Sequence, residues 1–60
     1  MLKIKELREQ AGITQTTLSE ALGITQACVA KWETGEASPR TEKLPKLAEV
    51  LGCTIDELFG

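Results

Sequence analysis

Residues suited to recognising another molecule are concentrated between Gln26 and Thr34. At 100° per residue of helix, Val29 and Trp32 point to one side of this segment. Small or polar residues occupy the rest of it, with Gln26 and Cys28 at the flanks: Gln26, Ala27, Cys28, Ala30, Lys31 and Thr34. Glutamine can form two hydrogen bonds to an adenine edge, alanine can contact a thymine methyl, and lysine can reach guanine or phosphate. This face therefore favours contact with base edges, although helix propensity alone is another explanation for its alanines.

Catalytic and metal chemistry find little support in the composition. There is no histidine, which removes the commonest general base and metal ligand at neutral pH. Two cysteines, Cys28 and Cys53, cannot by themselves form a four-ligand zinc site. A redox role for Cys28 is possible, but a small packing residue is the simpler interpretation. We expect no enzyme activity, no metal, no cofactor and no small-molecule substrate.

Length and charge limit the other possibilities. Sixty residues allow one domain, which we place at residues 1–60. No secretion signal precedes it and no apolar run is long enough to cross a bilayer, so we expect a cytoplasmic protein without a membrane partner. The net charge of −2 argues weakly against a nucleic-acid partner. Residues 1–35 are balanced, with four basic and four acidic side chains, and the acidic excess lies in residues 36–60.

Short helices separated by glycines must position these residues. Apolar residues at three- and four-residue spacing predict helices that end before Gly12, Gly23, Gly35 and Gly52. The predicted helices span residues 2–11, 14–22, 25–34, 45–51 and 55–59, with a loop at 36–40 and a turn at 41–44. Pro45 is expected to be the first residue of the fourth helix. No segment alternates like a strand, so the fold is predicted to be all-α.

Three helix starts share one arrangement of cap and apolar contact. Thr14, Thr25 and Thr54 are predicted N-caps. An apolar residue precedes each cap and another follows four positions after it, which is the hydrophobic staple: Ile13 with Leu18, Ile24 with Val29, and Cys53 with Leu58. Thr54 and Glu57 also form a predicted capping box. The caps fix the angles at which the chain enters these helices.

The link between the second and third helices carries the strongest signal. Two short helices joined by Gly23-Ile24-Thr25 are typical of a helix-turn-helix. Gln15 lies in the first turn of the second helix, where free N–H groups suit a phosphate. Arg8 and Glu33 are predicted to pair and to brace the first helix against the third, although two unrelated surface charges would satisfy the spacing equally well. Trp32 is expected in the core.

Together these residues resemble the Cro/cI-type (XRE-like) helix-turn-helix family over positions 4–59. The match rests on Ile4-Lys5-Glu6-Leu7-Arg8, Gly12-Ile13-Thr14-Gln15, Leu18, Ala21-Leu22-Gly23-Ile24-Thr25-Gln26, Val29, Trp32-Glu33, Gly35, Pro39, Leu44, Leu47-Ala48, Leu51-Gly52 and Asp56-Glu57-Leu58. The resemblance implies a compact five-helix bundle of the lambda-repressor-like DNA-binding type, with its third helix in the major groove.

The resemblance to this family implies a role for each of several residues. Base contacts fall on Gln15, Gln26, Ala27 and Lys31. Phosphate contacts fall on Thr14, Thr25, Cys28, Thr34 and Arg40. Arg8 and Glu33 match the family's structural ion pair. The chain departs from the family at Glu36, where a basic residue is common, and at Ala27 and Ala30, which offer fewer hydrogen bonds.

The resemblance implies a sequence-specific DNA-binding transcriptional regulator. We expect a repressor that binds a palindromic operator on double-stranded DNA as a homodimer, with half-sites roughly 34 Å apart. Ile55, Leu58 and Phe59 are the expected dimer surface, with core closure as their alternative role. A second hypothesis is a protein-interaction module, such as an antitoxin or a regulator's partner, that keeps this fold.

Overall fold

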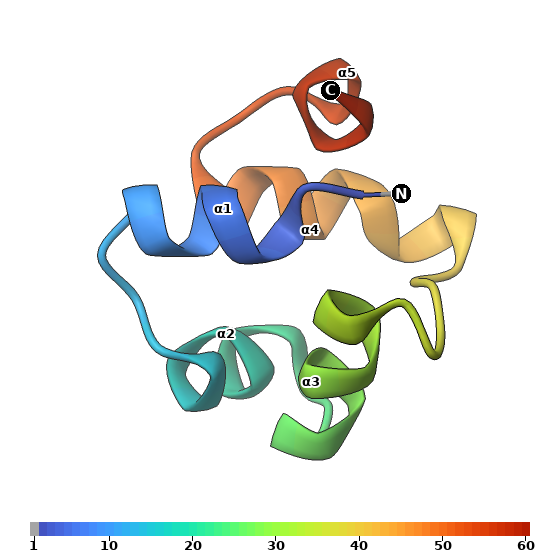
Figure 1. Ribbon diagram of the computed structural model, residues 1–60. Coiled ribbons are helices and arrows are strands. Elements are labelled where there is room, and N and C mark those ends of the chain that lie inside the picture. The colour runs from blue at the N-terminus through green and yellow to red at the C-terminus, as the bar shows by residue number, and fades with distance from the viewer. Residues whose placement is uncertain (1) are drawn as a thin grey trace.

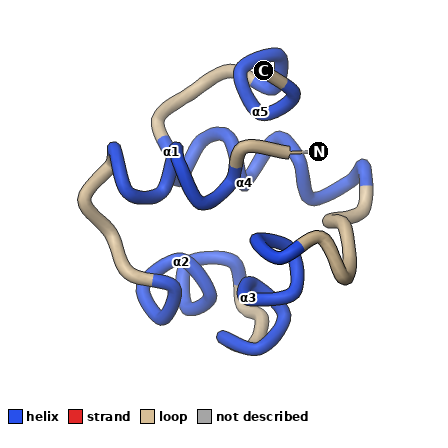
Figure 2. The backbone as a smooth tube through the Cα atoms, in the orientation of Figure 1, coloured by secondary structure: helices blue, strands red, loops and turns tan. Residues whose placement is uncertain are grey.

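Five α-helices and one 3-10 turn make up the chain in the computed structural model, which describes residues 2–60. The elements are α1 (Ile4–Gln10), α2 (Gln15–Leu22), α3 (Gln26–Thr34), η1 (Thr41–Lys43), α4 (Leu44–Leu51) and α5 (Ile55–Phe59). Figure 2 shows helices joined by short loops and no strand over this range. None of these helices is long and apolar enough to cross a bilayer. The predicted all-α, five-helix fold is confirmed.

Side-chain caps and left-handed glycines delimit α2, α3 and α5. The hydroxyl of Thr14 accepts from the backbone N–H of Thr17 at 3.1 Å, and that of Thr25 accepts from Cys28 at 3.2 Å. The capping box is present, since Thr54 accepts from the N–H of Glu57 and the Glu57 carboxylate accepts from the N–H of Thr54. Gly23 and Gly35 adopt φ of 70° and 87°, which other residues rarely tolerate. The helix boundaries are therefore determined locally.

α2 and α3 begin one residue after their predicted starts, because the caps Thr14 and Thr25 precede the helices, and two further helix starts differ from the sequence prediction. α4 begins at Leu44, one residue earlier than expected, because η1 leads directly into it. Pro45 still lies in the first turn, where its missing N–H leaves no helical hydrogen bond unmade. α1 begins at Ile4 rather than at residue 2. The N–H of Lys3 instead donates to the carbonyl of Leu58 at 2.8 Å, which joins the two ends of the chain.

The core draws on every α-helix, with α4 at its centre. Figure 1 shows α4 behind α1, the α2–α3 pair on one side of them and α5 on the other. Within residues 2–60, nine apolar residues are buried: Ile4, Leu18, Val29, Trp32, Leu44, Leu47, Ala48, Leu51 and Leu58. Four of them come from α4. The core position predicted for Trp32 is confirmed, and this core supports α3 from behind.

The staple residues divide between the core and its margin. Leu18, Val29 and Leu58 are fully buried, and Ile13, Ile24 and Cys53 pack against them half-buried. The burial of Leu58 corrects its assignment to the dimer surface, because its side chain closes the core instead. Ile55 and Phe59 remain 39% and 61% exposed on α5.

Candidate nucleic-acid interface

The α2–α3 corner is the element that a nucleic-acid interface would be built on. Gly23, in the left-handed conformation, is the C-cap of α2, and Thr25, two residues later, is the N-cap of α3. The two helices pack directly against each other at one end of the molecule (Figure 1). Ile24, between them, packs against the core and thereby holds the turn. This is the geometry of a helix-turn-helix.

The outward face of α3 lies in solvent. Gln26, Ala27, Lys31 and Thr34 are exposed, whereas Val29 and Trp32 are buried on the opposite side. Ala30 and Cys28 are half-buried, so they form the edges of the face, and Ala30 is less outward than expected. The side chains of Gln26 and Lys31 are consequently accessible to another molecule.

Arg8 and Glu33 lie together behind this face. Arg8 Nε donates to Glu33 Oε2 at 2.7 Å, and a second guanidinium nitrogen lies 3.4 Å from Oε1. Arg8 Nη1 also donates to the carbonyl of Ile13 at 2.8 Å. The side chains of Arg8 and Glu33 are only 12% and 4% exposed. The ion pair therefore connects α1, the loop before α2, and the end of α3.

Electrostatics keep both members of this pair charged. Burial alone would raise the pKa of the Glu33 carboxyl. Hydrogen bonds from Arg8 and Gln15, with the charges of Arg8 and Lys5, outweigh burial and hold that pKa below its ordinary value. The hydrogen bond to Glu33 likewise raises the pKa of Arg8. Glu33 is therefore a fixed carboxylate acceptor at neutral pH.

Glu33 also accepts a hydrogen bond from Gln15, and this bond orients both Gln15 and Gln26. Gln15 Nε2 donates to Glu33 Oε1 at 2.9 Å, which turns Gln15 Oε1 away from the carboxylate. Gln26 Nε2 lies 3.4 Å from Gln15 Oε1 and donates a hydrogen bond to it. One N–H and the carbonyl oxygen of Gln26 remain available. All four residues, Arg8 included, are predicted from the sequence, whereas the contacts of Gln15 with Glu33 and with Gln26 are not.

The residues expected near phosphates are spread around the corner. Thr14 and Thr25 are exposed caps at the starts of α2 and α3. Thr34 is exposed at the end of α3, and its hydroxyl lies 3.2 Å from the carbonyl of Lys31 and 3.4 Å from Glu36 Oε1. Arg40 is exposed in the loop before η1, outside the hydrogen-bond network of the glutamines.

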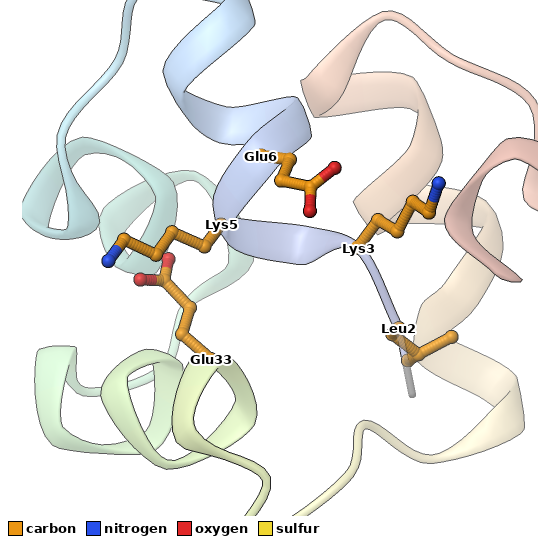
Figure 3. Close-up of a pocket in the computed structure, with 5 residues that line it drawn as sticks. All are labelled: Leu2, Lys3, Lys5, Glu6 and Glu33. Carbon is orange, nitrogen blue, oxygen red and sulfur yellow. The ribbon is translucent and has the colours of Figure 1, made fainter. Parts of the chain in front are cut away.

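An open pocket of about 330 Å³ lies between the start of α1 and the end of α3. Leu2, Lys3, Lys5, Glu6 and Glu33 line it. Figure 3 shows Lys5 reaching from α1 toward the carboxylate of Glu33, with Glu6 and Lys3 pointing elsewhere. The Glu33 oxygens already accept hydrogen bonds from Arg8 and Gln15, so this pocket is an open groove beside the hydrogen-bond network.

α2 and α3 form a tight two-helix corner, and the exposed face of α3 begins with the side-chain amide of Gln26. This arrangement defines a helix-turn-helix domain. Residues 4–58 match the family described as "Helix-turn-helix", and the chain belongs to it. The resemblance to the Cro/cI-type (XRE-like) members is confirmed by the relatives and the solved structure that it matches.

The relatives carry regulator names. The chain is 36% identical over 58 residues to the "HTH-type transcriptional activator BcrR" of Enterococcus faecalis, covering 97% of this chain and 28% of that protein. It is 38% identical over 63 residues to the "Cryptic phage CTXphi transcriptional repressor RstR" of Vibrio cholerae serotype O1, covering 98% and 56%. It thus spans between about a quarter and just over half of these two proteins.

A solved structure supports the fold independently. The P22 c2 repressor protein, in complex with synthetic operator 9T in the presence of Tl+, superposes with a TM-score of 0.84 and 30% sequence identity. The match covers 93% of this chain and 85% of that one. The lambda-repressor-like fold class is therefore confirmed.

Proposed function

We propose that residues 1–60 form the sequence-specific DNA-binding domain of a transcription regulator, with α3 lying in the major groove. The observation that carries this proposal is the exposed face of α3, whose leading glutamine is oriented from behind by Gln15 and Glu33. A helix of this kind presents its N-terminal residues to base edges. The named activator and repressors among the relatives, and the operator bound to the P22 c2 repressor, support the same function.

Base recognition is assigned to Gln15, Gln26, Ala27 and Lys31. With one N–H held by Gln15, Gln26 retains one donor and one acceptor, which is the pair that the N7 and N6 atoms of adenine require. The methyl group of Ala27 can contact thymine, and Lys31, one turn further along, can reach guanine. We therefore expect adenine opposite Gln26.

Backbone contacts are assigned to Thr14, Thr25, Cys28, Thr34 and Arg40. The N-termini of α2 and α3 present N–H groups and a partial positive charge, which favour phosphates. Thr14 and Thr25 lie at those two ends. Few cations take part, so we expect binding to fall only modestly as salt increases.

The domain is proposed to act as a cytoplasmic repressor that dimerises on a two-fold operator. Phe59 and Ile55 are the exposed large apolar residues among those described, and both lie on α5. Phe59 borders an open groove of about 290 Å³ lined also by Leu2, Pro39 and Leu44. Burying this patch against a second copy would remove apolar surface from water. Reading two half-sites on a two-fold operator would require the α3 helices of the dimer to lie roughly 34 Å apart.

Selection from a random duplex pool tests this function directly. We expect enrichment of two inverted half-sites whose centres are about 10 base pairs apart, because each subunit reads one half-site. A pool that shows no enrichment over the input would contradict sequence-specific binding. Enrichment of a single, non-repeated site would contradict the dimer but not the reading helix.

The net charge of −2 and the carboxylate of Glu36 favour a second function, a protein-interaction module such as an antitoxin. Titration with random-sequence duplex at low salt separates the two functions. A DNA-binding domain binds random duplex through phosphates even without its cognate site. No binding at low salt would favour the protein-interaction module.

A further inference from the structure

Glu36 occupies an unusual position at the end of α3. It follows Gly35, which ends the helix at φ 87°, and its side chain is exposed. Its Oε1 lies 3.4 Å from the hydroxyl of Thr34, which is also 3.2 Å from the carbonyl of Lys31. The single hydroxyl proton of Thr34 is thus shared between two acceptors of its own chain.

Electrostatics give Glu36 no evident role in stabilising the fold. The C-terminus of a helix carries a partial negative charge, so a carboxylate just beyond α3 is placed against that charge. Within residues 2–60, Arg8–Glu33 is the ion pair that forms within 4 Å, and Glu36 has no such cation partner. The carboxylate is therefore neither buried nor neutralised, and it faces solvent beside Thr34.

We propose that Glu36 is an affinity-limiting residue that weakens contact between the end of α3 and the DNA backbone. This inference rests on the proposed DNA-binding function. When the start of α3 lies in the groove, its last turn approaches the sugar-phosphate chain, where Thr34 is assigned. Glu36 both engages the Thr34 hydroxyl and places a negative charge beside a negatively charged phosphate.

The proposed effect does not depend on sequence. Phosphates position a protein on the duplex but carry no base identity, so Glu36 lowers affinity for cognate and random duplex by the same factor. A single subunit then binds weakly, and stable occupancy requires two subunits on two half-sites. Glu36 would in this way make operator binding depend on dimer formation.

Three variants test this role in the full chain. Glu36→Gln removes the charge and keeps an acceptor for Thr34, and Glu36→Ala removes both. Glu49→Gln is the matched control, because Glu49 is an exposed carboxylate in the last turn of α4, outside the α2–α3 corner. Dissociation constants are measured by fluorescence anisotropy on a random duplex and on the duplex selected from the pool, over a series of salt concentrations.

We expect Glu36→Gln and Glu36→Ala to bind both duplexes about three- to ten-fold more tightly at low salt, as expected for removing one charge near a phosphate. The gain should shrink as salt rises, since screening weakens the repulsion. Glu49→Gln should bind like the parent. This pattern would support the role of Glu36.

Other patterns overturn it. If all four proteins bind with equal affinity, Glu36 does not limit binding, although the proposed DNA-binding function stands. If only Glu36→Ala binds more tightly, the charge is not the cause. If a gain appears on the selected duplex alone, Glu36 acts on base recognition and not on the backbone. If no protein binds either duplex, the proposed function fails and this role fails with it.

Discussion

At the scale of single residues, Glu33 determines the geometry of the glutamines at the start of α2 and α3. Its carboxylate accepts hydrogen bonds from Arg8 on one side and from Gln15 on the other, and Gln15 in turn accepts from Gln26. A side chain that contacts no base in the proposed complex therefore sets which atoms Gln26 presents. In the proposed complex the ion pair would thereby contribute to recognition as well as to packing.

Replacing the leading glutamine tests direct reading. Gln26→Ala should weaken binding to the selected duplex by roughly 1–3 kcal/mol and relax the preference at one base pair of each half-site. Binding to random duplex should change little. Gln10→Ala, at the exposed end of α1, is the control. An unchanged base preference in Gln26→Ala, measured by repeating the selection, would contradict the placement of α3 in the groove.

Acid should destabilise the fold through Glu33. Its pKa in the folded state lies below the ordinary value of 4.5, so the unfolded chain binds more protons at acidic pH. The stabilising contribution of Glu33 is therefore present above pH 4.5 and is lost as the pH falls through the folded-state pKa. Denaturant unfolding at several pH values measures the slope. Glu33→Gln should be less stable than the parent at neutral pH and should depend less on pH in the acidic range. Identical slopes for the two proteins would contradict this account.

At the scale of elements, threonine caps and left-handed glycines set the α2–α3 corner. Three residues separate the two helices, and Thr25 both ends the link and accepts the N–H of Cys28. The angle between α2 and α3 is fixed further by Ile24, which packs against the core. Local sequence therefore determines how far α3 projects from the domain.

Removing the cap should destabilise the reading helix. Thr25→Ala leaves the N–H of Cys28 without its side-chain acceptor and should lower the free energy of unfolding by about 0.5–2 kcal/mol. Thr16→Ala, at an exposed position within α2, serves as the control and should change stability by less than about 0.5 kcal/mol. Thermal and denaturant unfolding measure both. Equal effects of the two substitutions would argue against a capping role for Thr25.

At the scale of the whole molecule, α5 contributes residues both to the core and to an exposed apolar patch. Leu58 is fully buried among residues of the core, whereas Phe59, the next residue, is 61% exposed. A domain of 60 residues has little apolar surface to spare, and a large exposed aromatic side chain indicates a surface for association. The same short helix thus closes the fold and carries the patch that we propose contacts a second copy.

Neighbouring substitutions on α5 should separate association from folding. Phe59→Ala should shift the protein toward monomer in sedimentation equilibrium and leave the free energy of unfolding of the monomer within about 1 kcal/mol, because its side chain is mostly in solvent. Leu58→Ala should instead cost about 2–5 kcal/mol of stability by opening a cavity. A parent protein that is monomeric at every concentration, or a Phe59→Ala variant that still dimerises, would contradict the α5 interface.

Local patterns sufficed to predict most of the fold. The caps at Thr14, Thr25 and Thr54 and the glycines after them act over three or four residues, so helix number and boundaries follow from the sequence to within a residue or two. α4 begins one residue before the predicted Pro45, because proline is compatible with either the first or the second helical position. The periodicity of α3 likewise predicted which of its faces lies outward.

Tertiary packing determines which side chains from different helices contact each other. Arg8, Gln15 and Glu33 are up to 25 residues apart in the chain, and only the packing of α1 and α2 against the end of α3 brings their side chains within hydrogen-bond distance. Leu58 is buried and its neighbour Phe59 is exposed because of the way α5 packs against α4, which likewise depends on the tertiary structure. Periodicity specifies which face of a helix is apolar, but the partner that covers it is determined by the arrangement of all the helices.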